Sequence, residues 1–298
     1  MFFGITIGIV SAVMQSASYL FSRRFVTTYH SSVKLVLYSQ LGMGLFGLIV
    51  FAATVPFTAF PHSVKFVATL ATYVIAYNAA FYCFFRAVNE IEASRLSSLL
   101  GLKVVVIALI MLLLHKAQLR APHYVAVVLT AVSAVGMNFS GVRISRKGAL
   151  FLALTLLGFS TTDITGTMFV KMMPGAAVTR SAICVTSLSY VILGGISAAA
   201  FLKLRFEKAP LWGALPYGAL WFAAMLLLFA SFGIVGVVFG SIIQASRGIV
   251  SVLFGVILAR TGYVSVEPDV PARIWVRRAV MAVVMVAAIG LYSWSSAR

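Results

Sequence analysis

Ten long apolar runs divide this chain, and each is about as long as a helix that crosses a membrane. A membrane-spanning helix needs about 20 predominantly apolar residues. The runs lie at residues 2–22, 33–54, 64–86, 92–114, 122–140, 148–172, 179–203, 211–232, 238–259 and 271–294. They are too long and too uniformly apolar for barrel strands, whose residues alternate between lumen and lipid. The sequence therefore predicts an all-α integral membrane protein with about ten transmembrane helices.

The composition excludes a soluble enzyme. Of the 298 residues, 62% are hydrophobic and only 10% are charged, whereas about 25% are charged in soluble domains. The mean hydropathy is +1.06. No polar stretch is long enough for a soluble domain, and residues 260–278, the longest weakly hydrophobic segment, are expected to form a loop. The first run has no basic leader or small-residue cleavage site, so we expect a retained helix and not a removed signal peptide.

The chain is strongly basic, with 23 Lys and Arg against 6 Asp and Glu and a net charge of +17. Most of these cations lie in the short segments between apolar runs, as the positive-inside rule expects. We therefore expect no nucleic-acid partner. Of the two alternating sets of loops, one contains 15 basic residues and the other, which includes the termini, contains 6. This count favours both termini outside.

Ten spans also suggest a repeat of five helices. Residues 1–147 would form the first half and residues 148–298 the second, inverted in the membrane because five is odd. In the fourth run, Ser98-Leu-Leu-Gly-Leu-Lys103 resembles Ser241-Ile-Ile-Gln-Ala-Ser-Arg247 in the ninth run. In both, a Ser is followed by two aliphatic residues and then by a basic residue at five or six positions.

Three ionisable residues lie well inside predicted spans: Lys103, Asp163 and Arg247. A charge near the bilayer centre costs about 2.5–3.5 kcal/mol on insertion scales, so such residues rarely face lipid. An inverted repeat would bring Lys103 and Arg247 together near the midplane. Two cations and one carboxylate leave a positive surplus that would attract a carboxylate or phosphate. Asp163 could balance one cation or take up a proton.

Two other interpretations of these charges stay open. Asp163 and Arg247 could form a structural ion pair that fixes helix packing. Alternatively, Lys103 could reach a membrane interface with its long side chain.

Polar residues within the spans extend the candidate substrate site. Those expected to supply hydrogen bonds are Gln15, Tyr77, Asn78 and Gln244. On the third helix, Tyr73, Tyr77, Asn78 and Tyr82 are predicted to share one broad face that lines a substrate path. Ordinary interhelical hydrogen bonding explains these residues equally well, and Gly44 and Gly194 are typical of close helix packing.

Known catalytic motifs are missing. The sequence contains no HExxH, GxSxG or P-loop pattern. Its four His lie near loops without metal-ligand spacing, and Cys83 and Cys184 lie in apolar runs. We therefore expect no catalytic residue, no metal site, no cofactor and no ATP-driven pump, and a membrane-embedded enzyme is the weakest alternative.

The chain resembles the drug/metabolite transporter superfamily, in its EamA-like ten-helix branch. The resemblance rests on the helix count, the short loops, the half-repeat and two stretches at residues 93–100 and 230–258. Lys103 and Arg247 fall close to the places where typical members have a mid-helix proline, and the Gly-Glu pair that usually ends these helices is absent. The resemblance implies a divergent secondary transporter with a central cavity between its halves, and relatives are described with both termini in the cytoplasm.

These observations together predict a multi-pass transporter of the inner or plasma membrane. It would export a small polar, anionic or amino-acid-like metabolite by alternating access. The expected partners are this substrate and the lipid bilayer, and a homodimer is left open. A lipid-headgroup flippase or a non-transporting scaffold is the alternative. A flippase requires polar residues that open toward lipid, and a scaffold requires no cavity.

Overall fold

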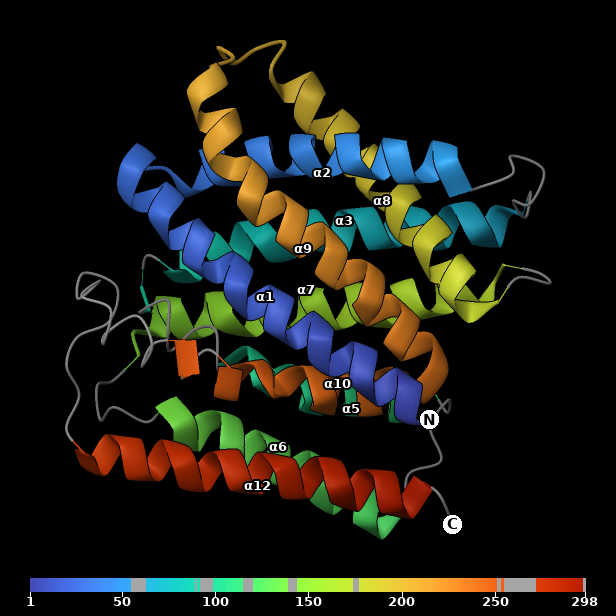
Figure 1. The fold of residues 1–298 in the computed structure, drawn as a ribbon, viewed down its shortest axis with the longest axis vertical. Coiled ribbons are helices and arrows are strands. Elements are labelled where there is room, and N and C mark those ends of the chain that lie inside the picture. Colours follow the sequence, from blue (N-terminus) through green and yellow to red (C-terminus); the bar gives the residue numbers. More distant parts are fainter. Residues whose placement is uncertain are drawn as a thin grey trace.

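The fold is a bundle of helices (Figure 1). In this computed structural model, the described residues are 1–54, 63–88, 90–91, 99–114, 120–138, 144–173, 177–250, 253–254 and 272–296. Every regular element among them is a helix. The elements are α1 (Phe2–Tyr29), α2 (Ser32–Thr54), α3 (Val64–Val88), η2 (Leu100–Leu102), α5 (Lys103–Leu113), α6 (Ala121–Asn138), α7 (Arg146–Lys171), α8 (Val178–Ala200), α9 (Lys208–Val235), α10 (Val237–Ala245) and α12 (Ala272–Ser296).

The prediction of a helical membrane protein is confirmed. Seven helices of the described residues are long and apolar enough to span a membrane, and shorter apolar helices cover Leu100–Leu113, Ala121–Met137 and Val237–Val250. Large aliphatic side chains such as Leu48, Ile49 and Val283 are 53–70% exposed, which suits a lipid environment. Each predicted span contains helix, but residues 92–98 and 255–259 lie outside the described residues. The count of ten crossings stays a prediction.

Helices from the two halves of the sequence pack against one another (Figure 1). The most extensive contacts are α1 with α9, α2 with α8, α3 with α7, and α6 with α12, and α5 also contacts α10. If the first five spans are matched in order to the last five, α1 matches α7 and α3 matches α9, so the contact of α1 with α9 matches the contact of α7 with α3. In each of the other contacting pairs, the two helices match one another. The pairing is therefore the same when the two halves are exchanged, whereas the inverted orientation and the boundary at residues 147 and 148 stay predictions.

Several helix ends differ from the predicted ones. α1 continues seven residues beyond residue 22, so Arg23 and Arg24 lie within a helix and not in a loop. No Gly or Pro interrupts this stretch, and the helix ends where His30 adopts a left-handed conformation with φ of 49°. Between the predicted runs 211–232 and 238–259, only Gly236 separates α9 from α10, and its φ of 85° suits glycine.

The contact of α2 with α8 depends on two glycines. A Cβ placed on Gly44 would lie 2.7 Å from the Cα of Gly194. The absence of side chains at both positions lets the two backbones touch, as expected for small residues at helix interfaces in membranes. This prediction from the sequence is confirmed.

The fourth run and its counterpart, the ninth, each contain a helix irregularity. In the first half, the 3₁₀ turn Leu100–Leu102 leads directly into α5 at Lys103. In the second half, α10 ends at Ala245, Ser246 forms a turn, and residues 247–250 resume a helix. The two basic residues therefore lie where helical hydrogen bonding changes. Interrupted helices at membrane depth are tolerated where they are buried in protein or line a cavity.

Candidate functional site

The structure brings the three predicted ionisable residues together inside the bundle. Lys103 is the first residue of α5, Asp163 lies in the second half of α7, and Arg247 follows α10. Their exposed fractions are 6%, 5% and 4%. Because Lys103 is buried within the bundle, the alternative that it reaches a membrane interface is wrong.

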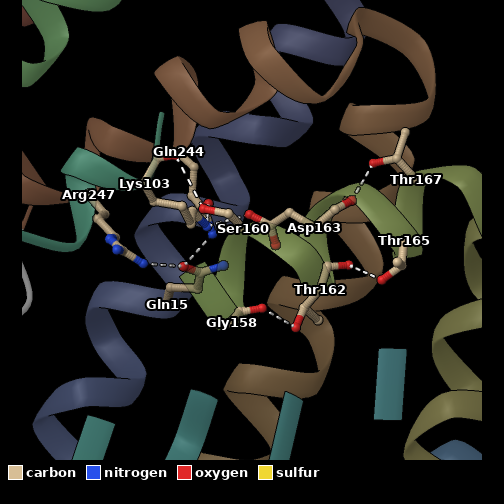
Figure 2. Close-up of polar contacts among 10 residues, drawn as sticks. All are labelled: Gln15, Lys103, Gly158, Ser160, Thr162, Asp163, Thr165, Thr167, Gln244 and Arg247. Atoms are coloured by element: carbon tan, nitrogen blue, oxygen red, sulfur yellow. Dashed lines mark hydrogen bonds and ion pairs between the residues drawn. The ribbon is translucent and has the colours of Figure 1, made fainter. Parts of the chain in front are cut away.

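Lys103 has a carboxylate partner. Its Nζ lies 2.6 Å from Asp163 Oδ2 and also donates to Gln244 Oε1 at 2.5 Å (Figure 2). The predicted pair of Asp163 with Arg247 is therefore corrected, because the carboxylate pairs with the cation of the first half. A buried ion pair of this kind is expensive to break, since removing either member leaves an unpaired charge.

Arg247 lacks such a partner. Its Nη1 donates to Gln15 Oε1 at 3.2 Å, and its Nε, although buried, has no hydrogen-bond partner in the described part of the chain. Gln15 Oε1 also accepts from Gln244 Nε2 at 3.0 Å. With both donors on its oxygen, the fully buried Gln15 leaves its Nε2 unsatisfied. Buried donors without acceptors cost about 1–3 kcal/mol each, so this side of the site is incomplete.

Gln244 joins the two cations into one network. It accepts from Lys103 and donates to Gln15, which in turn accepts from Arg247 (Figure 2). With Lys and Arg protonated and Asp163 ionised, the network has one net positive charge. Three of the residues, Asp163, Gln244 and Arg247, come from the second half of the sequence, and Gln15 and Lys103 come from the first.

Two serines connect the helix irregularities to neighbouring helices. Ser16 on α1 donates to the carbonyl oxygen of Arg247 at 3.1 Å and to that of Ala12 at 2.9 Å. Ser160 on α7 lies 3.4 Å from the carbonyl oxygen of Lys103. Backbone carbonyls freed by an interrupted helix need such partners in a membrane.

A small cavity adjoins the network. Its volume is about 30 Å³, and one water molecule needs roughly 10–15 Å³ of such space. Its lining residues are Tyr19, Tyr73, Tyr77, Leu100, Lys103, Phe159, Thr162, Asp163, Trp221, Met225, Leu228, Phe229, Gln244 and Arg247. Charged and amide groups line one part of the cavity, and aromatic and aliphatic side chains line the rest. The cavity is small beside a metabolite.

Three aromatic residues form a hydrogen-bonded cluster beside the cavity. Trp221 Nε1 lies 3.2 Å from Tyr77 Oη and 3.0 Å from Tyr190 Oη, and the two hydroxyls are 3.2 Å apart. The polar atom of Tyr77 is thereby used within the protein, so Tyr77 contributes its ring to the wall. Tyr73 is fully buried and its hydroxyl has no hydrogen-bond partner among the described residues.

Asn78 and Tyr82 lie away from the cavity. Asn78 contacts Gln40 Nε2 at 3.4 Å, and Gln40 accepts from Ser197 at 2.7 Å, so these residues form a separate interhelical network. Tyr82 is 59% exposed and accepts from Arg86. The prediction of one common face is wrong for Asn78 and Tyr82. Successive residues of a helix are rotated by about 100° around its axis, which places positions 73 and 82 on opposite sides.

Tyr19, Tyr190 and Trp221 have no sequence pattern that would mark them as site residues. Aromatic residues within apolar runs look like ordinary core residues, and no spacing links positions on α1, α8 and α9. Among the described residues no cluster of three His, Cys, Asp or Glu could hold a metal. The site offers charge, hydrogen-bond donors and aromatic surface, which are means of binding.

Comparison with known proteins agrees with this architecture. One solved crystal structure is similar over 99% of this chain and 98% of its own, with a TM-score of 0.69 and 14% sequence identity. At that identity the likeness shows the fold alone. Comparison with curated proteins finds no match. The model of the EamA-like transporter family matches residues 2–139. This match confirms the resemblance to drug/metabolite transporters and indicates a membrane transporter in general.

Proposed function

We propose that this protein is a secondary transporter that moves a small anionic metabolite by alternating access. The observation that carries the proposal is the meeting of Lys103 and Arg247, one from each half of the sequence, beside one cavity with a single carboxylate among its described lining residues. The substrate's anionic group binds Arg247, while Gln15 and Gln244 orient the guanidinium. We further propose export across the inner or plasma membrane.

The arrangement of the helices supports the alternating-access part of the proposal. The principal contacts of the bundle pair helices of one half with helices of the other. Rocking of one half against the other would therefore open a path to the cavity from either side. The cavity volume of about 30 Å³ is small, so a metabolite would need such a movement to enter.

The charge balance supports an anionic substrate. Lys103 is neutralised by Asp163 at 2.6 Å, whereas no carboxylate of the described residues pairs with Arg247. A guanidinium presents a planar set of donors that matches a carboxylate. A bound anion would supply the missing acceptor for Arg247 Nε. Asp163 is the group that would exchange a proton during transport.

Burial favours a solute carrier over a flippase or a scaffold. Lys103, Asp163, Gln244 and Arg247 are each at most 6% exposed, whereas headgroup handling requires polar residues that open sideways to lipid. A scaffold needs neither a cavity nor charges within the membrane. The inverted orientation of the halves and the homodimer stay predictions.

Transport by purified protein in liposomes tests this proposal. Radiolabelled small carboxylates should exchange across the membrane, and Lys103→Ala and Arg247→Ala should each lower the rate at least tenfold. Matched controls are Lys34→Ala, which removes a 43% exposed lysine paired with Glu207, and Arg86→Ala, which removes an exposed arginine. Unchanged transport in both cavity variants would reject the site, and transport of cations only would reject the anionic substrate.

A further inference from the structure

The composition of the cavity wall limits the substrate more narrowly than its charge does. Six of the fourteen lining residues are aromatic: Tyr19, Tyr73, Tyr77, Phe159, Trp221 and Phe229. Leu100, Met225 and Leu228 add aliphatic surface. A small polar solute would gain nothing from this surface. Apart from the tyrosine hydroxyls and the indole nitrogen of Trp221, the polar groups belong to Lys103, Thr162, Asp163, Gln244 and Arg247.

The rings are arranged to present apolar surface. Trp221 Nε1 and Tyr77 Oη already bond to each other and to Tyr190, so neither needs a polar group from a ligand. Tyr19 packs edge-on against Trp221 with centroids 5.9 Å apart, and Tyr73 packs against Phe229 at 5.8 Å. Aromatic pairs with such edge-to-face geometry can also accept a further ring.

The charges also discriminate against an ammonium group. Asp163, the one carboxylate among the described lining residues, is already paired with Lys103. A zwitterion would bring a third cation into the site, and because it is neutral overall it would leave the positive surplus unbalanced. A doubly charged anion would reverse the imbalance and leave a buried negative charge, which is equally costly. One negative charge on the ligand balances the site.

We propose that the substrate is an aromatic monocarboxylate without an ammonium group. Its carboxylate takes the unpaired Nε of Arg247, and its ring lies among the aromatic side chains of α1, α3, α7 and α9 once the halves separate. The unpaired hydroxyl of Tyr73 accommodates a polar substituent on that ring. This inference rests on the proposed function and specifies its substrate class.

The inference is tested on the full-length protein with phenylpropanoate and with two further ligands, each of which differs from it by one group. Phenylpropanoate, propanoate and phenylalanine are titrated into purified protein in nanodiscs, and affinity is measured by calorimetry and by the rise in melting temperature. Phenylpropanoate differs from propanoate by its ring and from phenylalanine by the missing ammonium. We expect phenylpropanoate to bind at least tenfold more tightly than either.

Single substitutions test whether Trp221 and Tyr73 contribute to the preference for an aromatic ligand. Trp221→Leu should bring the affinity for phenylpropanoate to within about threefold of that for propanoate, and Trp221→Phe should restore the preference. Trp212→Leu is the matched control, because Trp212 lies on the same helix but is 70% exposed. Tyr73→Phe should weaken hydroxyphenylpropanoate several-fold more than phenylpropanoate.

The outcomes separate this inference from the proposed function. Equal binding of propanoate would overturn the aromatic specificity, and equal binding of phenylalanine would overturn the exclusion of ammonium. In both cases anion transport would stand. Binding of phenylethylamine with no binding of any carboxylate would overturn both.

Discussion

The two buried cations occupy similar places in the two halves of the sequence but have different surroundings. Lys103 begins α5, and Arg247 follows α10, each at an irregular turn of its helix. Lys103 has a carboxylate at 2.6 Å. Arg247 has an amide oxygen at 3.2 Å and an Nε without any partner among the described residues.

On the proposed function, this difference separates a structural charge, Lys103, from a binding charge, Arg247. The first half supplies a cation that the second half neutralises through Asp163, so the pair joins α5 to α7. Arg247, the cation of the second half, donates to the neutral amide of Gln15. Its positive charge is therefore available to an anion. A symmetric site with two equivalent cations would have bound a doubly charged anion, whereas this asymmetric one suits a single charge.

The largest expected effect comes from removing the carboxylate of the structural pair. Asp163→Asn leaves Lys103 buried without a counter-charge, and breaking such a pair costs about 3–5 kcal/mol. The free energy of unfolding, measured by SDS titration in mixed micelles, should fall by about that amount. Adding Lys103→Met should recover most of the loss, because the lone charge is then gone. A variant as stable as the wild type would show that the pair does not join these helices.

Removing the other cation should weaken binding and leave stability less affected. Arg247→Met removes the donors that face the ligand, and hydrogen bonds to charged groups contribute about 1.5–3 kcal/mol. The dissociation constant for a bound carboxylate should therefore rise about tenfold to a hundredfold in calorimetry. Its free energy of unfolding should fall by less than that of Asp163→Asn. If Arg247→Met lost more stability than Asp163→Asn, the roles assigned to Lys103 and Arg247 would have to be exchanged.

Gln244 bonds to Lys103 and to Gln15, which in turn accepts from Arg247. Its replacement therefore tests whether the surroundings of the two cations act together. Gln244→Leu removes an acceptor from Lys103 and a donor from Gln15. Each loss costs roughly 0.5–1.5 kcal/mol net, so we expect about 1–3 kcal/mol less stability and a few-fold weaker anion binding. A double-mutant cycle with Arg247→Met gives the coupling energy. Full additivity of the two affinity losses would show that the amide does not position the guanidinium.

Much of the bundle can be predicted from hydropathy, because apolar runs of about 20 residues have few alternatives in a membrane. The cost of a buried charge likewise singles out Lys103, Asp163 and Arg247 from their positions within those runs. Both arguments use only the local sequence. They do not tell which cation Asp163 approaches, since the pairing depends on the rotation of α7 relative to α5 and α10.

The same limit explains the residues that were misplaced or overlooked. Tyr77 and Asn78 are adjacent, yet Tyr77 lines the cavity and Asn78 bonds to Gln40 in another network. Trp221 and Tyr190 are indistinguishable from core residues by hydropathy, and only packing brings them to Tyr77. Patterns along one helix predict which residues are buried, but contacts between helices decide what they do.

The smallest expected effects concern the two serines that contact the irregular turns. Ser16 donates to the carbonyl of Arg247 at 3.1 Å, close to the usual range for a hydroxyl donor, whereas Ser160 lies at 3.4 Å from that of Lys103, well beyond this range. Ser16→Ala should weaken anion binding by two- to fivefold, because a lost hydrogen bond of about 0.5–1 kcal/mol loosens the turn that bears Arg247. Ser160→Ala should leave affinity unchanged. Both are measured by calorimetry beside the wild type. Equal losses in the two variants would mean that Lys103 binds the anion as directly as Arg247 does, and the distinction between the two cations would fail.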